Sequence, residues 1–184
     1  MPNWCNNVMT LTHSDPAMID RATTALKEGT FLNEFFPCPR ELHEHESPIR
    51  DADLGARFME QYGATDWYNW QVQNWGTKWD VCAENGVDVV NVNTITASFE
   101  SAWAPPTQAY EKLCALGFEI RAHYYEPGMC FVGTWSGDEN DSFDDYYEYS
   151  GESSETVREV IGEELDDMFC ISESMSEWEE EENE

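Results

Sequence analysis

The sequence predicts an α+β fold in which two helices cover one face of a mainly antiparallel sheet and an acidic helix follows at the C-terminal end. Two observations predict it. Segments with the two-residue alternation of strands and segments with helical periodicity follow one another in the order strand, helix, excursion, strands, helix, strands. Hydrophobic residues make up 41% of the 184 residues and aromatic residues 14%, which suffices for the core of one domain with additions.

The first strand is expected at residues 6–13, "NNVMTLTH", where Met9 and Leu11 alternate with Val8 and two threonines. The first helix follows. Ser14 or Asp15 can cap its start, Pro16 suits its first turn and Gly29 can end it.

A long excursion is expected at about residues 30–80. Its first part, residues 30–48, contains three prolines and clustered phenylalanines, which indicates an irregular loop with aromatic side chains beneath it. Residues 50–63 predict a short helix. The last part, "NWQVQNWGTKWD" at residues 69–80, is rich in tryptophan.

The second half repeats the strand and helix pattern. Residues 86–103 give the strongest strand signal, with a break near Asn91 and Asn93. A second helix is expected at residues 104–117. Further strands are expected at residues 118–125, 129–135 and 144–150.

The sequence predicts a domain at residues 1–136 and an acidic module at residues 137–184. This module is expected to hold one helix at about residues 154–169, whose apolar stripe includes Val157 and Leu165, and a disordered acidic tail.

Charge is the most pronounced feature of the chain. It has 38 acidic and nine basic residues and a formal net charge of −29. Such a chain repels nucleic acids and anionic membranes and attracts basic surfaces. From Asp138 to Glu184 there are 20 acidic residues and one basic residue, Arg158, so the acidity is concentrated at the C-terminal end. We therefore expect no direct nucleic-acid or membrane partner, and a protein partner with a basic surface.

The chain shows no leader segment and no apolar run long enough to span a membrane, which predicts a cytoplasmic protein. The six cysteines are widely spaced and form no C-x-x-C motif, so we expect reduced and mostly buried thiols.

Several segments together resemble a known family: "MPNWCNN", "FLNEFFPCP", "NWGTKWD", "FESAWAPP" and "YYEPGMCFVG". They are similar to the family of phage and conjugative-plasmid proteins typified by YubB. The resemblance covers roughly residues 1–135, with the acidic segment from Asp138 onward outside it. It implies a ferredoxin-like fold and an origin in a mobile element, and it implies no activity.

The tryptophan segment has two interpretations. Tryptophan rings can stack nucleobases or pack against arginine, and a lysine among them can meet a phosphate. A candidate aromatic groove is therefore formed by Trp70, Trp75, Lys78, Trp79 and Trp103. Alternatively, the tryptophans fasten the excursion to the sheet, with a turn at Gly76 and an ion pair between Lys78 and Asp80. Trp4 is expected in the core.

The acidic module provides the second candidate site. On one helix, Glu155, Glu159, Glu163 and Asp166 would lie in a row with about 5–6 Å between neighbouring Cβ atoms, which is comparable to the spacing of phosphates along a nucleic acid. Such a row either imitates a phosphate backbone or is a solubilising surface. The candidate partner-binding residues are Asp138, Glu139, Asp141, Asp144, Asp145, Glu148, Glu155, Glu159, Glu163 and Asp166.

Motifs of catalysis and cofactor binding are not found, so we expect neither an enzyme nor a bound cofactor. His123 and Glu126 could serve as a general acid and base, but a chain with 38 carboxylates contains such pairs by chance. The "HEHE" segment at residues 43–46 is short of a zinc site, and "DENDSFDD" at residues 138–145 lacks the glycine and final glutamate of a calcium loop.

Three classes of function follow. The first is an interaction protein of a phage or plasmid that inhibits a host or defence protein by presenting a DNA-like acidic surface. The second is a module that binds a nucleotide or peptide in the tryptophan-lined groove. The third is a small enzyme with an unrecognised site. The charge and the resemblance favour the first.

Overall fold

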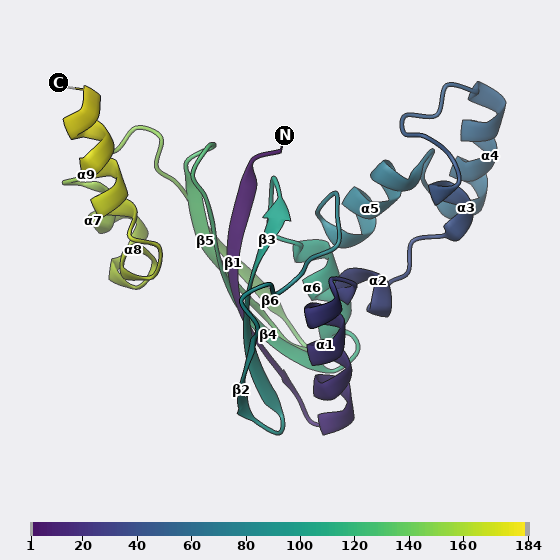
Figure 1. Ribbon diagram of the computed structural model, residues 1–184, viewed down its shortest axis with the longest axis horizontal. Coiled ribbons are helices and arrows are strands. Elements are labelled where there is room, and N and C mark those ends of the chain that lie inside the picture. The colour runs from purple at the N-terminus through teal and green to yellow at the C-terminus, as the bar shows by residue number, and fades with distance from the viewer. Residues whose placement is uncertain (1, 183–184) are drawn as a thin grey trace.

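The computed structural model describes residues 2–182. Its centre is one antiparallel sheet with the strand order β2-β3-β1-β4-β5-β6 (Figure 1). The strands are β1 (Trp4–His13), β2 (Val87–Asn91), β3 (Thr94–Ala102), β4 (Phe118–Glu126), β5 (Phe131–Gly137) and β6 (Ser142–Glu148). The helices are α1 (Pro16–Glu28), α2 (Phe31–Phe35), α3 (Arg40–His43), α4 (Ala52–Tyr62), α5 (Trp67–Trp75), α6 (Thr107–Cys114), α7 (Val157–Ile161), α8 (Glu163–Phe169) and α9 (Ile171–Glu182).

The fold is ferredoxin-like α+β, as the sequence predicted. Strands β1 to β4, with the helices α1 and α6 between them, follow the order strand, helix, two strands, helix, strand. Strand β1 lies at the centre, antiparallel to both β3 and β4. Strands β5 and β6 extend the sheet beyond β4. The expected break near Asn91 is the turn that joins β2 to β3.

The main core lies between the sheet and helices α1 and α6. On β1, Met9 and Leu11 are completely buried. On β4, Phe118, Ile120 and Tyr124 point to the same core and are at most 1% exposed. The two-residue alternation of these strands therefore predicted the buried face of the sheet correctly.

Helix α1 has the expected ends. The side chain of Asp15 accepts a hydrogen bond from the backbone N–H of Ala17 at 3.0 Å. Gly29 closes the helix in the left-handed conformation, with φ of 71°. Helix α6 begins after Pro106, as its two prolines predicted.

The excursion between α1 and β2 is more helical than expected. Two short helices, α2 and α3, replace the irregular loop predicted for residues 30–48, while α4 confirms the helix predicted at residues 50–63. The carboxylate of Asp80 accepts hydrogen bonds from the backbone N–H groups of Leu32 and Asn33, at 2.7 and 2.9 Å, and so caps α2. Proline spacing alone gave no sign of this distant cap. Helices α3 and α4 project away from the sheet (Figure 1).

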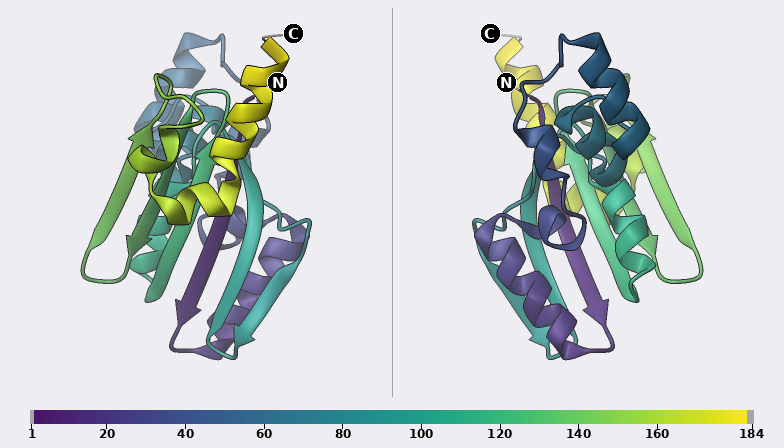
Figure 2. Two further views of the ribbon diagram at one scale, coloured as in Figure 1. Left: turned by 90° about the vertical axis from the view of Figure 1, so that its left-hand side faces the viewer. Right: turned by 90° about the vertical axis from the view of Figure 1, so that its right-hand side faces the viewer.

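The opposite face of the sheet carries the C-terminal helices, which stand in front of the strands in the left-hand view of Figure 2. They are attached by a second apolar cluster of buried residues: Val132, Tyr149, Val157, Ile161, Leu165 and Ile171. The single helix expected at residues 154–169 is divided at Gly162, whose φ of 85° and ψ of 157° suit glycine. The expected disordered tail is helical as α9, and residues 183–184 of it lie outside the described residues.

The cysteines are free thiols, and only half of them, Cys5, Cys38 and Cys114, are buried, where the sequence predicted that most would be. Burial raises the pKa of the Cys5 thiol to about 12, which keeps it protonated. Within residues 2–182, none of the helices combines the length and the apolar character that crossing a bilayer requires.

Candidate functional site

Four aromatic side chains gather around one lysine at the end of the sheet where the described chain begins. We call Trp4, Tyr68, Lys78, Trp79 and Trp103 the aromatic cluster. The ammonium nitrogen of Lys78 lies 4.4 Å from the ring centroid of Trp79, 5.5 Å from that of Trp103 and 5.8 Å from that of Tyr68. The rings of Trp4 and Trp79 are 5.8 Å apart. The three tryptophans are 38–41% exposed, so they are open to a ligand.

Several segments converge to build the aromatic cluster. Trp4 opens β1, and its pairing with Ala102 of β3 brings the ends of the two strands together. The backbone N–H of Trp103 then donates to the carbonyl of Asn3 at 2.9 Å. The hydroxyl of Thr77 is bonded to both the carbonyl and the N–H of Ala102 at 3.0 Å, which places Lys78 beside them.

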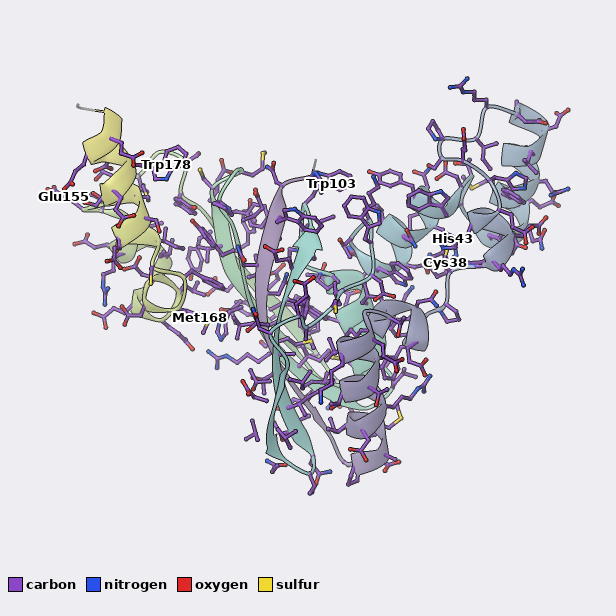
Figure 3. All side chains as sticks on the ribbon, viewed as in Figure 1. Cys38, His43, Trp103, Glu155, Met168 and Trp178 are labelled. Carbon is purple, nitrogen blue, oxygen red and sulfur yellow. The ribbon has the colours of Figure 1, made fainter. Side chains whose placement is uncertain are left out.

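The backbone of Trp103 is unusual. Its φ is 68°, in the left-handed region that glycine adopts freely and a bulky residue rarely adopts. Such a conformation costs free energy and persists where the surrounding structure enforces it, often at functional sites. Figure 3 shows Trp103 at the exposed end of the sheet, so the strained residue is also one that a ligand can reach.

The structure brings together three of the five residues predicted for the groove, Lys78, Trp79 and Trp103. Trp75 lies in the core at 1% exposure, and Trp70 packs against it edge to face at 6.0 Å, so neither lines the aromatic cluster. Two members were missed. Trp4 was expected in the core and is exposed instead, and the sequence carries no signal that would have placed Tyr68 there.

The ion pair expected between Lys78 and Asp80 is absent, because the carboxylate of Asp80 is bound to backbone N–H groups. Burial raises the pKa of Asp80, although those hydrogen bonds oppose the shift. In the part of the chain that the structure describes, Lys78 has no ion-pair partner and faces only rings. This arrangement can stack a flat group and place an anion beside the ammonium group.

The predicted acidic residues on β6 and the turn before it are mostly exposed. The side chain of Asp138 caps the turn by accepting from the N–H groups of Asn140 and Asp141, which lowers the pKa of Asp138. Asp144 accepts from the hydroxyl of Tyr124 at 2.6 Å, and Asp145 from that of Tyr147 at 2.7 Å.

The predicted carboxylate row on one helix is wrong. Glu155 precedes α7, and Gly162 separates Glu159 from Glu163. Asp166 is 2% exposed and points inward, where it accepts hydrogen bonds from the N–H and hydroxyl of Ser172, both at 2.8 Å. The glycine inside the helical pattern was the signal for this break.

Arg158 is held within the acidic module itself. Its guanidinium lies 3.0 Å from Asp166, 2.9 Å from Asp167 and 3.9 Å from Glu163. Arg158 is the only basic residue after Asp138, and the one cation from the sheet that pairs with the module in residues 2–182 is Arg121, whose guanidinium lies 2.9 Å from Glu164.

A cleft of about 620 Å³ lies on the same face of the sheet as the C-terminal helices. Its floor includes Asn6 and Glu100, from β1 and β3, and its walls are Glu84 on one side and Met168 on the other. Figure 3 shows Met168 at the boundary between the C-terminal helices and the sheet. Trp4 lines one end of this cleft and so joins it to the aromatic cluster.

The candidate acid–base residues are not brought together as a catalytic pair. Glu126 accepts from the N–H groups of Gly128 and Met129, which fixes the turn after β4. His123 bonds the hydroxyl of Thr134 at 2.9 Å. In the "HEHE" segment, His43 stacks on Trp67 with 5.9 Å between centroids, and residues 2–182 contain no group of three His, Cys, Asp or Glu side chains placed to hold a metal.

A crystal structure of protein api92 from Yersinia pseudotuberculosis matches with a TM-score of 0.46 and 12% identity, over 83% of this chain and 99% of that chain. A search of curated proteins finds no match.

The sequence profile of a family described as "Ferredoxin-like domain in Api92-like protein" matches residues 74–183. This range extends through residues 137–183 of the acidic module, whereas the resemblance to YubB-type proteins covers only about residues 1–135. Because the profile covers more than half of the chain, the protein belongs to the family of ferredoxin-like domains in Api92-like proteins.

Proposed function

We propose that this protein is a non-catalytic interaction protein that binds a basic, nucleic-acid-binding surface of another protein and inhibits it. The observation that carries the proposal is the state of Arg158. The one basic residue of the acidic module is neutralised by three carboxylates of that same module. Most of its other carboxylates are exposed, although Glu164 pairs with Arg121 of β4, so the module attracts a basic surface.

The module is also firmly placed. The second apolar cluster fastens α7, α8 and α9 to the sheet, with Val157 and Ile171 completely buried. Exposed carboxylates on this support, such as Glu155, Glu159 and Glu173, present negative charge from a fixed scaffold. A preorganised charged surface loses less conformational entropy on binding than a flexible acidic segment.

The finer part of the proposal concerns origin and mechanism. The similarity of the sequence to YubB-type proteins supports a phage or conjugative-plasmid origin, with a partner among host or defence proteins in the bacterial cytoplasm. Inhibition would operate by DNA mimicry, with carboxylates occupying sites that otherwise bind phosphates. Mimicry is supported by the negative charge of the module and its fixed placement. It is not supported by a regular row of carboxylates on one helix, because that predicted row was wrong.

The test is affinity capture from host cytoplasm at low and high salt, followed by mass spectrometry. We expect a basic nucleic-acid-binding protein that is lost at high salt, because the attraction is screened. The double variant Glu155→Lys with Glu159→Lys should weaken the complex while the fold survives. Asp20→Lys with Glu28→Lys is the matched control, since it makes the same charge change on exposed positions of α1, across the sheet.

Two results would sink the proposal. One is capture of no basic partner under either condition. The other is equal binding by the wild type and the Glu155 and Glu159 double variant, because the acidic module would then be dispensable.

The aromatic cluster favours a second candidate function, binding of a nucleotide or a peptide. The specific observation is Lys78, a cation without a carboxylate partner in the described chain, lying within 6 Å of three ring centroids. Titration with AMP, followed by tryptophan fluorescence, tests it. Trp79→Ala should abolish the signal change, whereas Trp178→Ala, at a residue 72% exposed on α9, should preserve it. A signal change that survives Trp79→Ala would rule out this site for AMP.

A further inference from the structure

The cleft between the sheet and α8 exists because the C-terminal helices cover only part of their face of the sheet. They pack on β4 and β5 through Tyr125 and Val132. The neighbouring positions on β1 and β3, Asn6 and Glu100, are left beneath an open space of about 620 Å³. This volume lies within the range of about 300–1,000 Å³ that is typical of ligand sites.

Both walls of the cleft are fixed by packing elsewhere. On one side, Phe169 lies 5.4 Å from Tyr125, ring to ring, which holds the end of α8 against β4. On the other side, the backbone N–H of Ala83 donates to the carbonyl of Leu26 at 2.9 Å and ties the loop that carries Glu84 to α1. The cleft is therefore preformed, and a ligand need not order it.

The lining is suited to a cation. Glu84 and Glu100 are exposed carboxylates, and neither takes part in the ion pairs of residues 2–182. The rings of Trp4, Tyr125 and Phe169 also line the space, and none of its described lining residues is basic. A cation gains from both the carboxylates and the ring faces, whereas the carboxylates would repel a phosphate.

An arginine side chain fits this lining better than a lysine side chain. Its guanidinium is planar, so it stacks on an aromatic face and also bonds a carboxylate in a bidentate manner. Polar side chains beside the carboxylates, Asn6 and Ser98 on the floor and Asn85 on the wall, can bond the backbone of an extended segment.

We propose that this cleft binds an arginine-bearing segment of the partner protein, with one guanidinium held between Glu84, Glu100 and the ring of Trp4. The inference rests on the proposed function in taking the partner to be basic, and it adds where and by which side chain the partner is held. Arginine in a pocket walled by aromatic rings is a common source of the tightest contacts in protein interfaces.

The probes are the peptides hexa-arginine and hexa-lysine, titrated into the full chain in about 150 mM salt, where the Debye length is about 8 Å and diffuse attraction is weak. Calorimetry gives the affinity, and amide and indole NMR shifts give the location. We expect hexa-arginine to bind at least about fivefold more tightly than hexa-lysine. The largest shifts should occur at the Trp4 indole and at the amides of Asn6, Ser98 and Glu100.

Matched variants separate the cleft from the general charge. Glu84→Gln with Glu100→Gln should weaken hexa-arginine at least about fivefold, whereas Asp20→Asn with Glu28→Gln, an equal loss of charge on exposed positions of α1 outside the cleft, should change it less than about twofold. All four positions are exposed and the replacements are close in shape, so both variants should fold. Their thermal melts check this.

Two results would overturn the proposal that the cleft binds arginine. Failure of hexa-arginine to bind is one. The other is equal affinity for the two peptides together with equal weakening by the two variant pairs, which would mean binding by overall charge. That second result leaves the proposed acidic interaction intact, and capture from host cytoplasm decides the proposed function independently of these peptides.

Discussion

The indole N–H of Trp75 donates a hydrogen bond to the backbone carbonyl of Phe36 at 2.9 Å, across 39 positions of the chain. Trp75 ends α5, and Phe36 directly follows α2. The bond therefore ties the last helix of the excursion to its first. Because Trp75 is 1% exposed and belongs to the main core, it also fastens the excursion to the sheet. Of the tryptophans in this segment, Trp75 is the one buried in the core, with Trp70 packed against it.

Replacing Trp75 should therefore cost much of the stability. We expect Trp75→Ala to lower the free energy of unfolding by about 3–5 kcal/mol, as large-to-small changes of buried aromatic residues do. Trp75→Phe keeps most of the volume and should cost less, mainly through the lost hydrogen bond. Urea denaturation measures both. Trp178→Ala, at an exposed position, should stay within about 0.5 kcal/mol of the wild type. A cost below about 1 kcal/mol for Trp75→Ala would contradict the role assigned to it.

The sheet and α1 followed from the sequence because their signals are local. Alternation of apolar residues decides which face of a strand is buried, and Asp15, Pro16 and Gly29 mark the ends of α1 within one turn. The cap of α2 is different, since Asp80 lies 48 positions from Leu32. A contact at that separation leaves no local pattern, and so the short helices were not predicted.

The candidate site was predictable only in part for a related reason. Trp75 and Trp79 are residues of the same type only four positions apart, yet Trp75 is buried and Trp79 is 38% exposed. The difference arises at Gly76, where the chain leaves α5 in the left-handed conformation and changes direction. Trp4 and Tyr68 join Trp79 through the register of β1 and β3 and through the placement of α5. Both are tertiary features that the spacing of tryptophans does not encode.

Asp166 should stabilise the acidic module more than its neighbour Asp167, although both carboxylates contact Arg158 at similar distances. Burial alone would raise the pKa of Asp166, but hydrogen bonds from Ser172 and Arg158 outweigh it and lower that pKa below its usual value. We expect Asp166→Asn to cost about 1–3 kcal/mol, because a nearly buried charged acceptor is lost.

Asp167→Asn is the control, since its side chain is 66% exposed and solvent screens the pair. It should cost less than about 1 kcal/mol. Urea denaturation gives the stabilities, and hydrogen exchange at the Ser172 amide reports the loss locally. Equal costs for the two variants would show that Asp166 acts only as an exposed ion-pair partner.

His123 should make stability depend on pH near neutrality. Burial, reinforced by the neighbouring Arg121 guanidinium, lowers the pKa of His123 below its usual 6.5, with Glu164 opposing the shift. The folded protein therefore favours the neutral ring. As the pH falls through 6.5, the unfolded chain takes up the proton first, so this contribution to stability declines until the folded pKa is passed.

The comparison that isolates this effect is the free energy of unfolding of the wild type minus that of His123→Gln, measured from about pH 8 to about pH 5. Subtraction removes the shared effect of the many carboxylates. The difference should be larger at the upper end of this range than at the lower end. A difference that is constant, or that grows towards acid pH, would contradict the lowered pKa.

At position 103, replacement by glycine should leave the protein more stable than replacement by alanine, which is the reverse of the usual order. At most positions alanine is more stabilising than glycine, because glycine loses more conformational freedom on folding. At a φ of 68°, a residue that has a Cβ atom is strained by about 1–2 kcal/mol, which exceeds the entropic cost of glycine. We therefore expect Trp103→Gly to be more stable than Trp103→Ala by about 1 kcal/mol in urea denaturation. The two variants lose the same ring contacts with Tyr68 and Lys78, so the difference between their stabilities reports the backbone alone.

If alanine were the more stable replacement, Trp103 would carry no strain, and its backbone would give no reason to assign the aromatic cluster a function. If glycine is the more stable replacement, the tryptophan is kept at this position in spite of its backbone strain, which favours a role for its exposed ring.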